Sequence, residues 1–284
     1  MKTIGMISDR VRWDEKALIE AAKRKNVKLT LIDGKNIFLE ATGDFDRIPE
    51  ADVYLQRMVS AFKGLYITKI LESKGKKVIN SYSVSSICAD KLLTTLALRK
   101  AGIPSPRTFV AFDIEAALDV LEQLGYPAII KPVFGSWGRL IAILKDPQSA
   151  KAILESRESM GALYQIYYIQ EFVNKINNRD IRSFVIGDRV VAAIYRIAGK
   201  DEWRTNTALG GKAELCPVTP EIEELSLKTA KTLGDGVYGI DILETSDNML
   251  VNEVNHTMEY HTTVPLTGVD IPGMLIDYCL EIVK

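Results

Sequence analysis

Residues 249–260 read MLVNEVNHTMEY, an apolar run that carries a carboxylate, an amide and then a histidine. In a β-strand the residues i and i+2 point to the same side, so Glu253 and Asn255 are expected to project together. Two oxygen-bearing side chains on one rigid strand face suit a hard cation. Taken alone, the stretch fits an ordinary solvated strand face better, and partners elsewhere in the chain must decide.

A partner stands shortly before this stretch. VYGIDILET, residues 237–245, has a strand pattern, and with residues 249–255 it predicts a pair of neighbouring strands. Such a pair would bring Asp241 to Glu253 and Asn255. Two carboxylates and an amide oxygen, completed by phosphate oxygens and water, suit octahedral Mg²⁺, which rarely has an all-protein cage.

Composition narrows the class of protein. The 284 residues are 47% hydrophobic and 26% charged with a net charge of −1, which is typical of a soluble globular protein without a polybasic surface for nucleic acid or membranes. Cys88, Cys216 and Cys279 are far apart and form no CxxC pair, as expected for buried thiols in a reducing compartment. The N-terminus lacks a signal pattern and no long apolar window follows, so we expect a cytoplasmic protein.

The order of elements predicts an α/β fold with a mixed, more antiparallel second part. Strand patterns at 3–8, 27–33, 51–57 and 77–80 alternate with helical ones and predict a parallel, doubly wound sheet. One helix is expected from about Ser85 to Lys100, ending before Gly102 and two prolines. Further strands are expected at 107–112, around 128–144 and at 166–173, with a hairpin at 181–196; helices are expected at 114–124, 147–160, 219–233 and at the C-terminus.

The loop KPVFGSWGR, residues 131–139, is a candidate phosphate site because glycines let backbone N–H groups approach a phosphate closely. It matches neither the P-loop nor the GxGxxG pattern, and a plain hairpin turn is about as good an interpretation. Lys131 lies in an apolar run, where a charge is costly without an anionic partner. Lys91 is expected to open a helix after Asp90; each lysine alone is more simply a solvated surface charge, but together they suit triphosphate oxygens.

Residues 169–173, IQEFV, place Gln170 and Glu171 between apolar residues. Such a segment could present backbone groups to an adenine edge, with the carboxylate accepting from its amino group. The alternative is an edge strand with one charged residue facing outward. Arginines at 139, 179, 182, 196 and 204 offer forks for carboxylate or phosphate groups, although arginines at strand ends are usually surface pairs. Only two histidines and no GxSxG occur, so a serine or cysteine hydrolase lacks its parts.

In chain order, these motifs resemble the ATP-grasp ligases of the RimK-like group, and within it the LysX and ArgX type. The resemblance runs nearly end to end, and its motifs are Lys91, KPVFGSWGR, IQEFV, RDIRSFVIG, IYR, WRTNTALGG, Asp241 and NEVNHTMEY. It implies an ATP-grasp fold in three parts: an N-terminal α/β domain at 1–88, a small central lid at 89–170 and a C-terminal domain at 171–284. It also implies ATP and Mg²⁺ as cofactors, and commonly a homo-oligomer.

The resemblance implies a role for each matching position. ATP and its phosphates would be bound by Lys91, Lys131, Gly135, Ser136, Trp137, Gly138, Arg139, Gln170, Glu171, Phe172, Val173, Asp180 and Arg182. Mg²⁺ would be held by Asp241, Glu253 and Asn255. Arg196, Asn206 and Thr207 would be catalytic, near the acyl phosphate and the incoming amino acid. The reaction would join an amino acid to the terminal glutamate side chain of a small acidic carrier protein of the LysW type.

The amino acid stays open between α-aminoadipate and glutamate. Tyr260, His261, Thr262 and Thr263 occupy the positions where ligases for α-aminoadipate carry FKNS-like residues and those for glutamate carry FKGF-like residues. EWR at 202–204 leans toward the glutamate type, whereas NHTMEY and TGVDIPG lean toward the α-aminoadipate type. A RimK-like glutamate ligase acting on another protein or a cofactor is a second enzyme hypothesis. A nucleotide-binding module without catalysis is a third, disfavoured because the metal ligands and both lysines are present.

Overall fold

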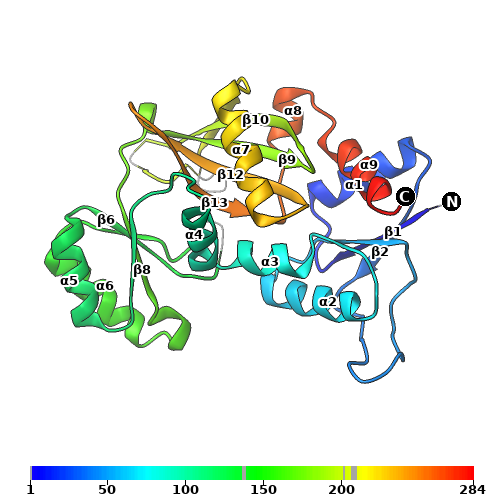
Figure 1. Ribbon diagram of the computed structural model, residues 1–284, viewed down its shortest axis with the longest axis horizontal. Coiled ribbons are helices and arrows are strands. Elements are labelled where there is room, and N and C mark those ends of the chain that lie inside the picture. Colours follow the sequence, from blue (N-terminus) through cyan, green and yellow to red (C-terminus); the bar gives the residue numbers. More distant parts are fainter. Residues whose placement is uncertain (1, 136–138, 201, 206–209) are drawn as a thin grey trace.

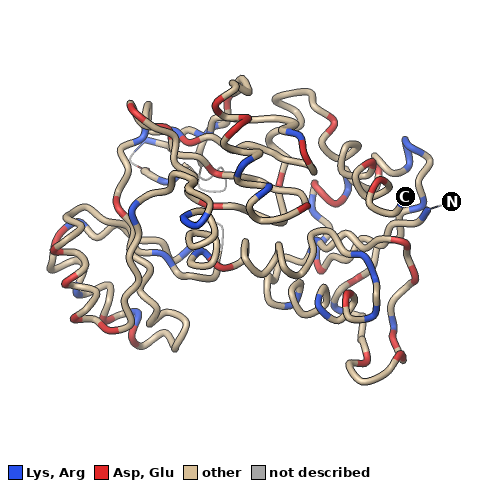
Figure 2. Tube along the Cα trace, viewed as in Figure 1, with Lys and Arg blue, Asp and Glu red and all other residues tan. Residues whose placement is uncertain are grey.

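The fold is built on three β-sheets, one after another along the chain (Figure 1). It was analysed as a computed structural model that describes residues 2–135, 139–200, 202–205 and 210–284. In this part of the chain, no helix combines the length and apolar character needed to cross a membrane. Charges of both signs are spread along the described chain (Figure 2).

The N-terminal sheet is parallel, with strand order β2-β1-β3-β4. Its strands are β1 (Thr3–Ser8), β2 (Lys28–Asp33), β3 (Val53–Gln56) and β4 (Val78–Ile79). Helices α1 (Trp13–Arg24) and α9 (Ile271–Ile282) pack on one face, and α2 (Ala61–Ser73) packs on the other. The C-terminal helix therefore returns to the first sheet, and both chain ends lie close together in Figure 1. The predicted parallel sheet is confirmed.

The second sheet is antiparallel, with order β5-β8-β6-β7, at the lower left of Figure 1. It comprises β5 (Thr108–Ala111), β6 (Ala128–Lys131), β7 (Ala142–Leu144) and β8 (Tyr167–Glu171), covered by α5 (Ile114–Leu124) and α6 (Pro147–Glu158). Strand β8 pairs on both sides, so the edge-strand interpretation of residues 169–173 is wrong. The short 3₁₀ helices η1 (Ala162–Tyr164) and η2 (Ile176–Asn178) flank it.

The third sheet is antiparallel and contains residues 249–255 as one of its strands. Its order is β11-β10-β9-β12-β13, from β9 (Arg179–Ile186), β10 (Arg189–Ile197), β11 (Lys212–Leu215), β12 (Val237–Glu244) and β13 (Met249–Asn255). Helix α7 (Pro220–Leu233) covers one face, and α8 (Thr263–Thr267) and α9 lie against the other. The predicted hairpin and the predicted pair of strands are confirmed as β9–β10 and β12–β13.

The single helix expected from about Ser85 to Lys100 is wrong. The segment forms two helices, α3 (Tyr82–Ala89) and α4 (Lys91–Lys100), separated by Asp90. Asp90 has extended backbone angles, and its carboxylate accepts from the amides of Leu92 and Leu93, so it caps α4. As a result Lys91 stands at the first residue of a helix whose direction differs from that of α3.

Candidate functional site

The register of the third sheet brings the expected metal ligands together. Asp241 on β12 lies directly opposite Glu253 on β13, and Gly239 lies opposite Asn255. Directly opposed residues of an antiparallel pair project from the same face, so the predicted juxtaposition of Asp241 and Glu253 is confirmed. The Asn255 amide donates to the Gly239 carbonyl at 3.4 Å, which turns its oxygen away from that carbonyl.

A β-bulge shapes this face. Asp241 pairs with Glu253 while the next residue, Ile242, pairs with Val251, so Asn252 is the extra residue of β13. A bulge interrupts strict alternation and re-aims side chains. The Asn252 side-chain oxygen consequently accepts from the Lys131 ammonium at 2.8 Å, on the side where Glu253 also lies. Strand alternation predicts Asn252 on the opposite face, which is why it could not be identified as a site residue from the sequence.

Asp241 is the centre of a buried ionic network. Arg182 donates to both of its carboxylate oxygens, and Arg196 approaches the same carboxylate at 2.9 Å. Burial alone raises the pKa of Asp241, but the two guanidinium groups outweigh it and hold the pKa below its usual range. Arg196 also binds Asp180 at 2.8 and 2.9 Å, and the Thr205 hydroxyl donates to Asp180. Arg196 is thus shared between two carboxylates and is almost fully buried.

Lys131 ends β6 in a buried position. Its ammonium donates to the Gln170 side-chain oxygen at 2.6 Å as well as to Asn252. Burial lowers the pKa of Lys131 to about 8, and the carboxylate of Glu253 partly opposes the shift, while the charge of Lys91 adds to it. Glu253 and Lys91 both affect this pKa because their charged groups lie close to the Lys131 ammonium. Among the described residues, the hydrogen-bond acceptors of Lys131 are the neutral oxygens of Gln170 and Asn252, so its positive charge can also attract a bound anion.

Lys91 reaches the same point from α4. Its ammonium donates to the Gly135 carbonyl at 2.6 Å and lies 3.4 Å from the Glu253 carboxylate. Its backbone amide donates to the Val133 carbonyl, and a β-bridge joins Asp90 to Phe134. These contacts fasten the start of the glycine-rich loop to the start of the helix.

The rest of the loop is only partly described. Gly135 has a φ of 122°, which a glycine adopts without strain, and Arg139 is exposed. Of the predicted site residues, five lie outside the described part of the chain: Ser136, Trp137, Gly138, Asn206 and Thr207. Their roles stay predictions.

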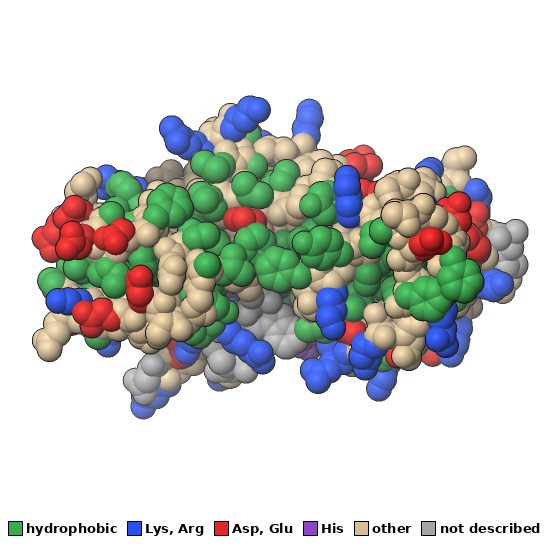
Figure 3. Space-filling model, turned by 90° about the horizontal axis from the view of Figure 1, so that it is seen from below, with side chains coloured by type: hydrophobic (Ala, Val, Ile, Leu, Met, Phe, Trp, Pro, Cys, Tyr) green, Lys and Arg blue, Asp and Glu red, His purple; other side chains and the backbone are tan. Residues whose placement is uncertain are grey.

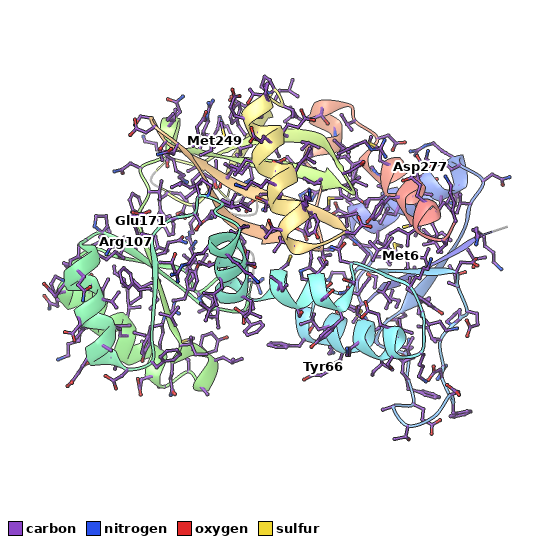
Figure 4. The ribbon with its side chains drawn as sticks, viewed as in Figure 1. Met6, Tyr66, Arg107, Glu171, Met249 and Asp277 are labelled. Atoms are coloured by element: carbon purple, nitrogen blue, oxygen red, sulfur yellow. The ribbon has the colours of Figure 1, made fainter. Side chains whose placement is uncertain are left out.

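The segment expected at adenine is fixed by backbone pairing. The Glu171 carboxylate accepts from the Arg107 amide at 2.7 Å, and the Glu171 amide donates to the Arg107 carbonyl at 2.9 Å. Figure 4 shows Glu171 and Arg107 next to each other. Phe172 lies near Trp203, with ring centroids 6.3 Å apart, and Val173 is half-buried. The adenine assignment for Glu171 and Val173 stays a prediction.

The four residues expected to choose the amino acid differ in exposure. Tyr260 and Thr263 are buried, and the Tyr260 hydroxyl donates to the Asp14 carbonyl at 3.2 Å. Thr262 is half-buried, and the His261 side chain is 49% exposed and 3.6 Å from the Asp14 carboxylate. Of the four, only His261 and Thr262 therefore keep surface available to a substrate.

The donor set fits Mg²⁺. Glu253 keeps a partly exposed carboxylate, and no described residue donates a hydrogen bond to the side-chain oxygen of Asn255. Asp241 accepts three hydrogen bonds from arginines and retains one of its roughly four lone-pair positions. Three oxygens with open coordination on two adjacent strands match a cation that keeps several waters and phosphate oxygens.

Comparison with known proteins now adds the family. Residues 88–279 match the RimK-like ATP-grasp domain, and residues 4–87 match the LysX preATP-grasp domain. The chain belongs to the RimK-like ATP-grasp family. It is therefore a ligase of the ATP-grasp type, as its motifs predict.

The relatives that match over nearly the full length are named for two different amino-acid substrates. The chain is 42% identical over 275 residues to the alpha-aminoadipate–LysW ligase LysX of Saccharolobus solfataricus, covering 96% of this chain and 99% of the relative. It is 34% identical over 277 residues to the glutamate–LysW ligase ArgX of Sulfolobus acidocaldarius, covering 97% of both chains. Among solved structures, a RimK-domain ATP-grasp protein from Sphaerobacter thermophilus superposes with a TM-score of 0.83 at 24% identity, over 97% of this chain and 98% of that one. The ATP-grasp fold is thus confirmed.

Proposed function

We propose that this ligase joins the α-amino group of α-aminoadipate to the C-terminal glutamate side chain of a LysW-type carrier protein, with ATP and Mg²⁺. The observation that carries the proposal is that Lys91 lies 3.4 Å from Glu253, opposite Asp241, while Lys131 binds the adjacent Asn252. Two lysines and a pair of carboxylates on one sheet face supply positive charge for phosphates and oxygen ligands for a metal. The choice of α-aminoadipate is supported by the higher identity to LysX relatives, 38–42%, than to ArgX relatives, 34%.

The reaction has two steps. A carboxylate oxygen of the carrier attacks the γ-phosphorus of ATP, ADP leaves, and an acyl phosphate forms. The amino group then attacks the acyl carbon, inorganic phosphate leaves with that carboxylate oxygen, and the amine loses a proton. Mg²⁺ held by Asp241, Glu253 and Asn255 would neutralise charge developing on the transferred phosphoryl group.

The chain's own residues do the positioning. Lys91 and Lys131 would hold phosphate oxygens, and Lys91 also holds the loop carbonyl of Gly135 over them. The buried pair of Arg196 and Asp180 gives the floor of the site a fixed electrostatic arrangement that needs no reorganisation during the reaction. No side-chain nucleophile is required, because catalysis of this kind rests on positioning and electrostatics.

Glutamate is the second candidate substrate. It is supported by the ArgX relatives at 34% identity over nearly the whole chain and by EWR at 202–204, which leans toward the glutamate type, whereas the sequence of Tyr260–Thr263 matches neither type. Glutamate and α-aminoadipate differ by one methylene, which a pocket discriminates by only about 1–3 kcal/mol. A RimK-like reaction on another protein or a cofactor is the further alternative.

The test is to incubate the purified enzyme with Mg-ATP and a LysW-type carrier and to follow carrier mass and ADP. α-Aminoadipate and glutamate are added in separate tubes. A mass gain with α-aminoadipate alone supports the proposal, and a gain with glutamate alone replaces it by the second candidate. ADP release without a gain in carrier mass would contradict a carrier-directed ligase.

We also propose that the enzyme acts in the cytoplasm as a homo-oligomer. Three cysteines that are all buried and unpaired fit a reducing compartment. Helices α2 and α4 expose apolar side chains, with Phe62 at 45%, Tyr66 at 70% and Leu96 at 47% of full exposure. Figure 3 shows apolar side chains gathered across the middle of the lower face, a surface type that marks interaction sites. Size-exclusion chromatography with light scattering tests this, and a mass of 31.6 kDa, that of a single chain, would contradict the oligomer.

A further inference from the structure

The segment that follows β13 has no regular secondary structure, so its backbone groups need other partners. Three of them find side chains. The His256 carbonyl accepts from the Asn80 amide at 2.8 Å, and the Met258 carbonyl accepts from the Arg57 guanidinium at 2.8 Å. The Tyr260 amide donates to the Asp14 carboxylate at 2.6 Å. Every second residue from 256 to 260 is thus held by one side chain.

All three holding side chains come from the N-terminal sheet and its helices. Asp14 lies in the first turn of α1, Arg57 follows β3 and Asn80 follows β4, and each residue is at most 3% exposed. A polar group buried this deeply is costly unless it is hydrogen-bonded. Three buried polar side chains are therefore used to bind the backbone of one irregular segment. Packing the two parts of the chain together would not by itself require them.

Asn80 is the most constrained of the three. Beyond His256, its amide also donates to the Val237 carbonyl at 2.8 Å, and its oxygen accepts from the Val237 amide at 2.7 Å. A Cβ on Gly236 would lie 2.4 Å from that oxygen, so a residue with a side chain would push the amide away. Asn80 therefore ties the start of β12 to the residue directly after Asn255.

The other end of the segment leads into the residues considered for substrate choice. The Asp14 carboxylate that accepts from Tyr260 also faces His261 at 3.6 Å. Arg57 additionally donates to Glu15 at 2.9 Å, and Arg12 binds Glu15 and Glu259, which ties the same segment down through side chains. Three residues of chain span at most about 11 Å, so Met258 lies within that reach of Asn255.

We infer that Asp14, Arg57 and Asn80 are positioning residues for the ligase reaction. They fix the backbone of residues 256–260 and thereby place Asn255 at one end and His261 and Thr262 at the other. The inference rests on the proposed function, because it assigns the two ends of the segment to Mg²⁺ and to the incoming amino acid. The N-terminal domain thus sets the geometry of a site built on the third sheet.

The two ends give two different expected defects. Asn80→Asp replaces two donors by a carboxylate facing two carbonyl oxygens, next to Asn255. It should raise the Mg²⁺ concentration for half-maximal activity about tenfold and reduce the rise in melting temperature that Mg·ADP produces, since small displacements of positioned groups are costly. Asp14→Ala removes the acceptor for Tyr260, so KM for the amino acid should rise about tenfold with a smaller change in kcat. Asp14→Asn keeps an acceptor for that amide and should restore most of the KM.

The matched control is Leu71→Ala. Leu71 is as deeply buried in the same domain, but it packs on the other face of the sheet, in the cluster with Ile7 and Tyr54. This variant should lower the melting temperature and leave KM, the Mg²⁺ requirement and hydrogen exchange of residues 256–260 unchanged. Asn80→Asp and Asp14→Ala should both speed that exchange. If Asn80→Asp does not fold, Arg57→Lys takes its place, since lysine keeps a charge for Glu15 without the fork that also reaches Met258.

The outcomes separate the two proposals. Wild-type kinetics and exchange in folded Asn80→Asp and Asp14→Ala would overturn the inference, as would a Leu71→Ala variant that reproduces their defects. Failure of the wild type to ligate either amino acid would overturn the proposed function instead. In that case the exchange of residues 256–260 and the Mg·ADP-induced rise in melting temperature still test the positioning roles.

Discussion

At the scale of single residues, the site is defined by charges kept where water is excluded. Lys131 shows most clearly that burying a charge is unfavourable, because burial lowers its pKa to about 8 in the free enzyme. Against the ordinary lysine value of about 10.4, this shift is equivalent to about 3 kcal/mol of unfavourable free energy for the charged form. The lowered pKa also predicts a pH dependence of stability. Between about pH 8 and 10.4 the unfolded chain binds more protons than the folded one, so the free energy of unfolding should rise with pH in this range.

Replacing Lys131 by methionine should separate function from stability. Lys131→Met should weaken ATP binding at pH 7 by about 10- to 100-fold, which corresponds to a charged hydrogen bond of about 1.5–3 kcal/mol. Titration calorimetry measures this directly. Lys151→Met, at an exposed lysine of α6 that lies 4.0 Å from Glu155, is the control and should bind ATP as the wild type does. Equal affinities in the two variants would contradict a phosphate-binding role for Lys131.

The same lysine predicts a pH dependence. Below pH 8 the Lys131 ammonium is charged and attracts phosphate oxygens, and above that value the free enzyme loses the charge. ATP affinity should therefore fall as the pH rises through about 8, whereas Lys131→Met should lack this step. Calorimetric titrations from pH 6.5 to 9.5 check both. A wild-type affinity that is flat over this range would be inconsistent with the assignment.

Glu253 should be required for metal-dependent turnover. Glu253→Gln keeps the shape of the side chain but removes the charge opposite Asp241, so ADP release should fall by about 100-fold or more with the fold unchanged. Glu244→Gln is the matched control, because that carboxylate ends β12 and pairs with Arg179 at 2.9 Å rather than facing the metal site. If Glu253→Gln released ADP at the rate of the control, the assignment of Glu253 as a Mg²⁺ ligand would be wrong.

At the scale of elements, helix α4 and the bulge in β13 position the charged and polar side chains of the candidate site. The break between α3 and α4 aims Lys91 at Glu253, and the break exists because Asp90 caps the second helix. The bulge turns Asn252 toward Lys131 without disturbing Glu253. Both devices are local irregularities in otherwise regular elements, as is common near active sites.

The cap predicts a coupled loss of stability and activity. Asp90→Ala should lower the free energy of unfolding by about 0.5–2 kcal/mol and also raise KM for ATP, because Lys91 follows the cap directly. Asp113→Ala removes the equivalent cap of α5, where the carboxylate accepts from the Glu115 amide, and should lower stability alone. Urea unfolding and steady-state kinetics on both variants provide the comparison. Equal KM values in the two variants would show that the cap does not position Lys91.

The elements also show how far sequence reasoning reaches. Apolar strand patterns predicted the strands of all three sheets apart from the short polar β11. The i, i+2 rule placed Glu253 with Asn255, and the expected pairing of two neighbouring strands brought Asp241 to Glu253. Asn252 was out of reach because a bulge is set by register between two strands, which no single-strand pattern encodes. The break at Asp90 was within reach, since an aspartate before Lys91 is an N-cap signal, but the apolar pattern on both sides masked it.

At the scale of the whole molecule, the second and third sheets meet at the candidate site, and the N-terminal part of the chain holds the segment that leads away from it. Helix α9 packs against α1, and Asp14, Arg57 and Asn80 hold the segment after β13. The order of the three parts was predictable from the resemblance to RimK-like ligases. These long-range contacts were not, because they join residues more than 150 positions apart whose local sequence looks unremarkable.

In the proposed reaction, this site activates a carboxylate by phosphorylation before the amide forms. The most direct measurement uses a LysW-type carrier labelled with ¹⁸O in the side-chain carboxylate of its terminal glutamate, with Mg-ATP and α-aminoadipate. One ¹⁸O atom is expected in the inorganic phosphate for each amide formed, since phosphate leaves with a carboxylate oxygen. Amide formation with unlabelled phosphate would contradict carboxylate phosphorylation and with it the assigned chemistry of the site.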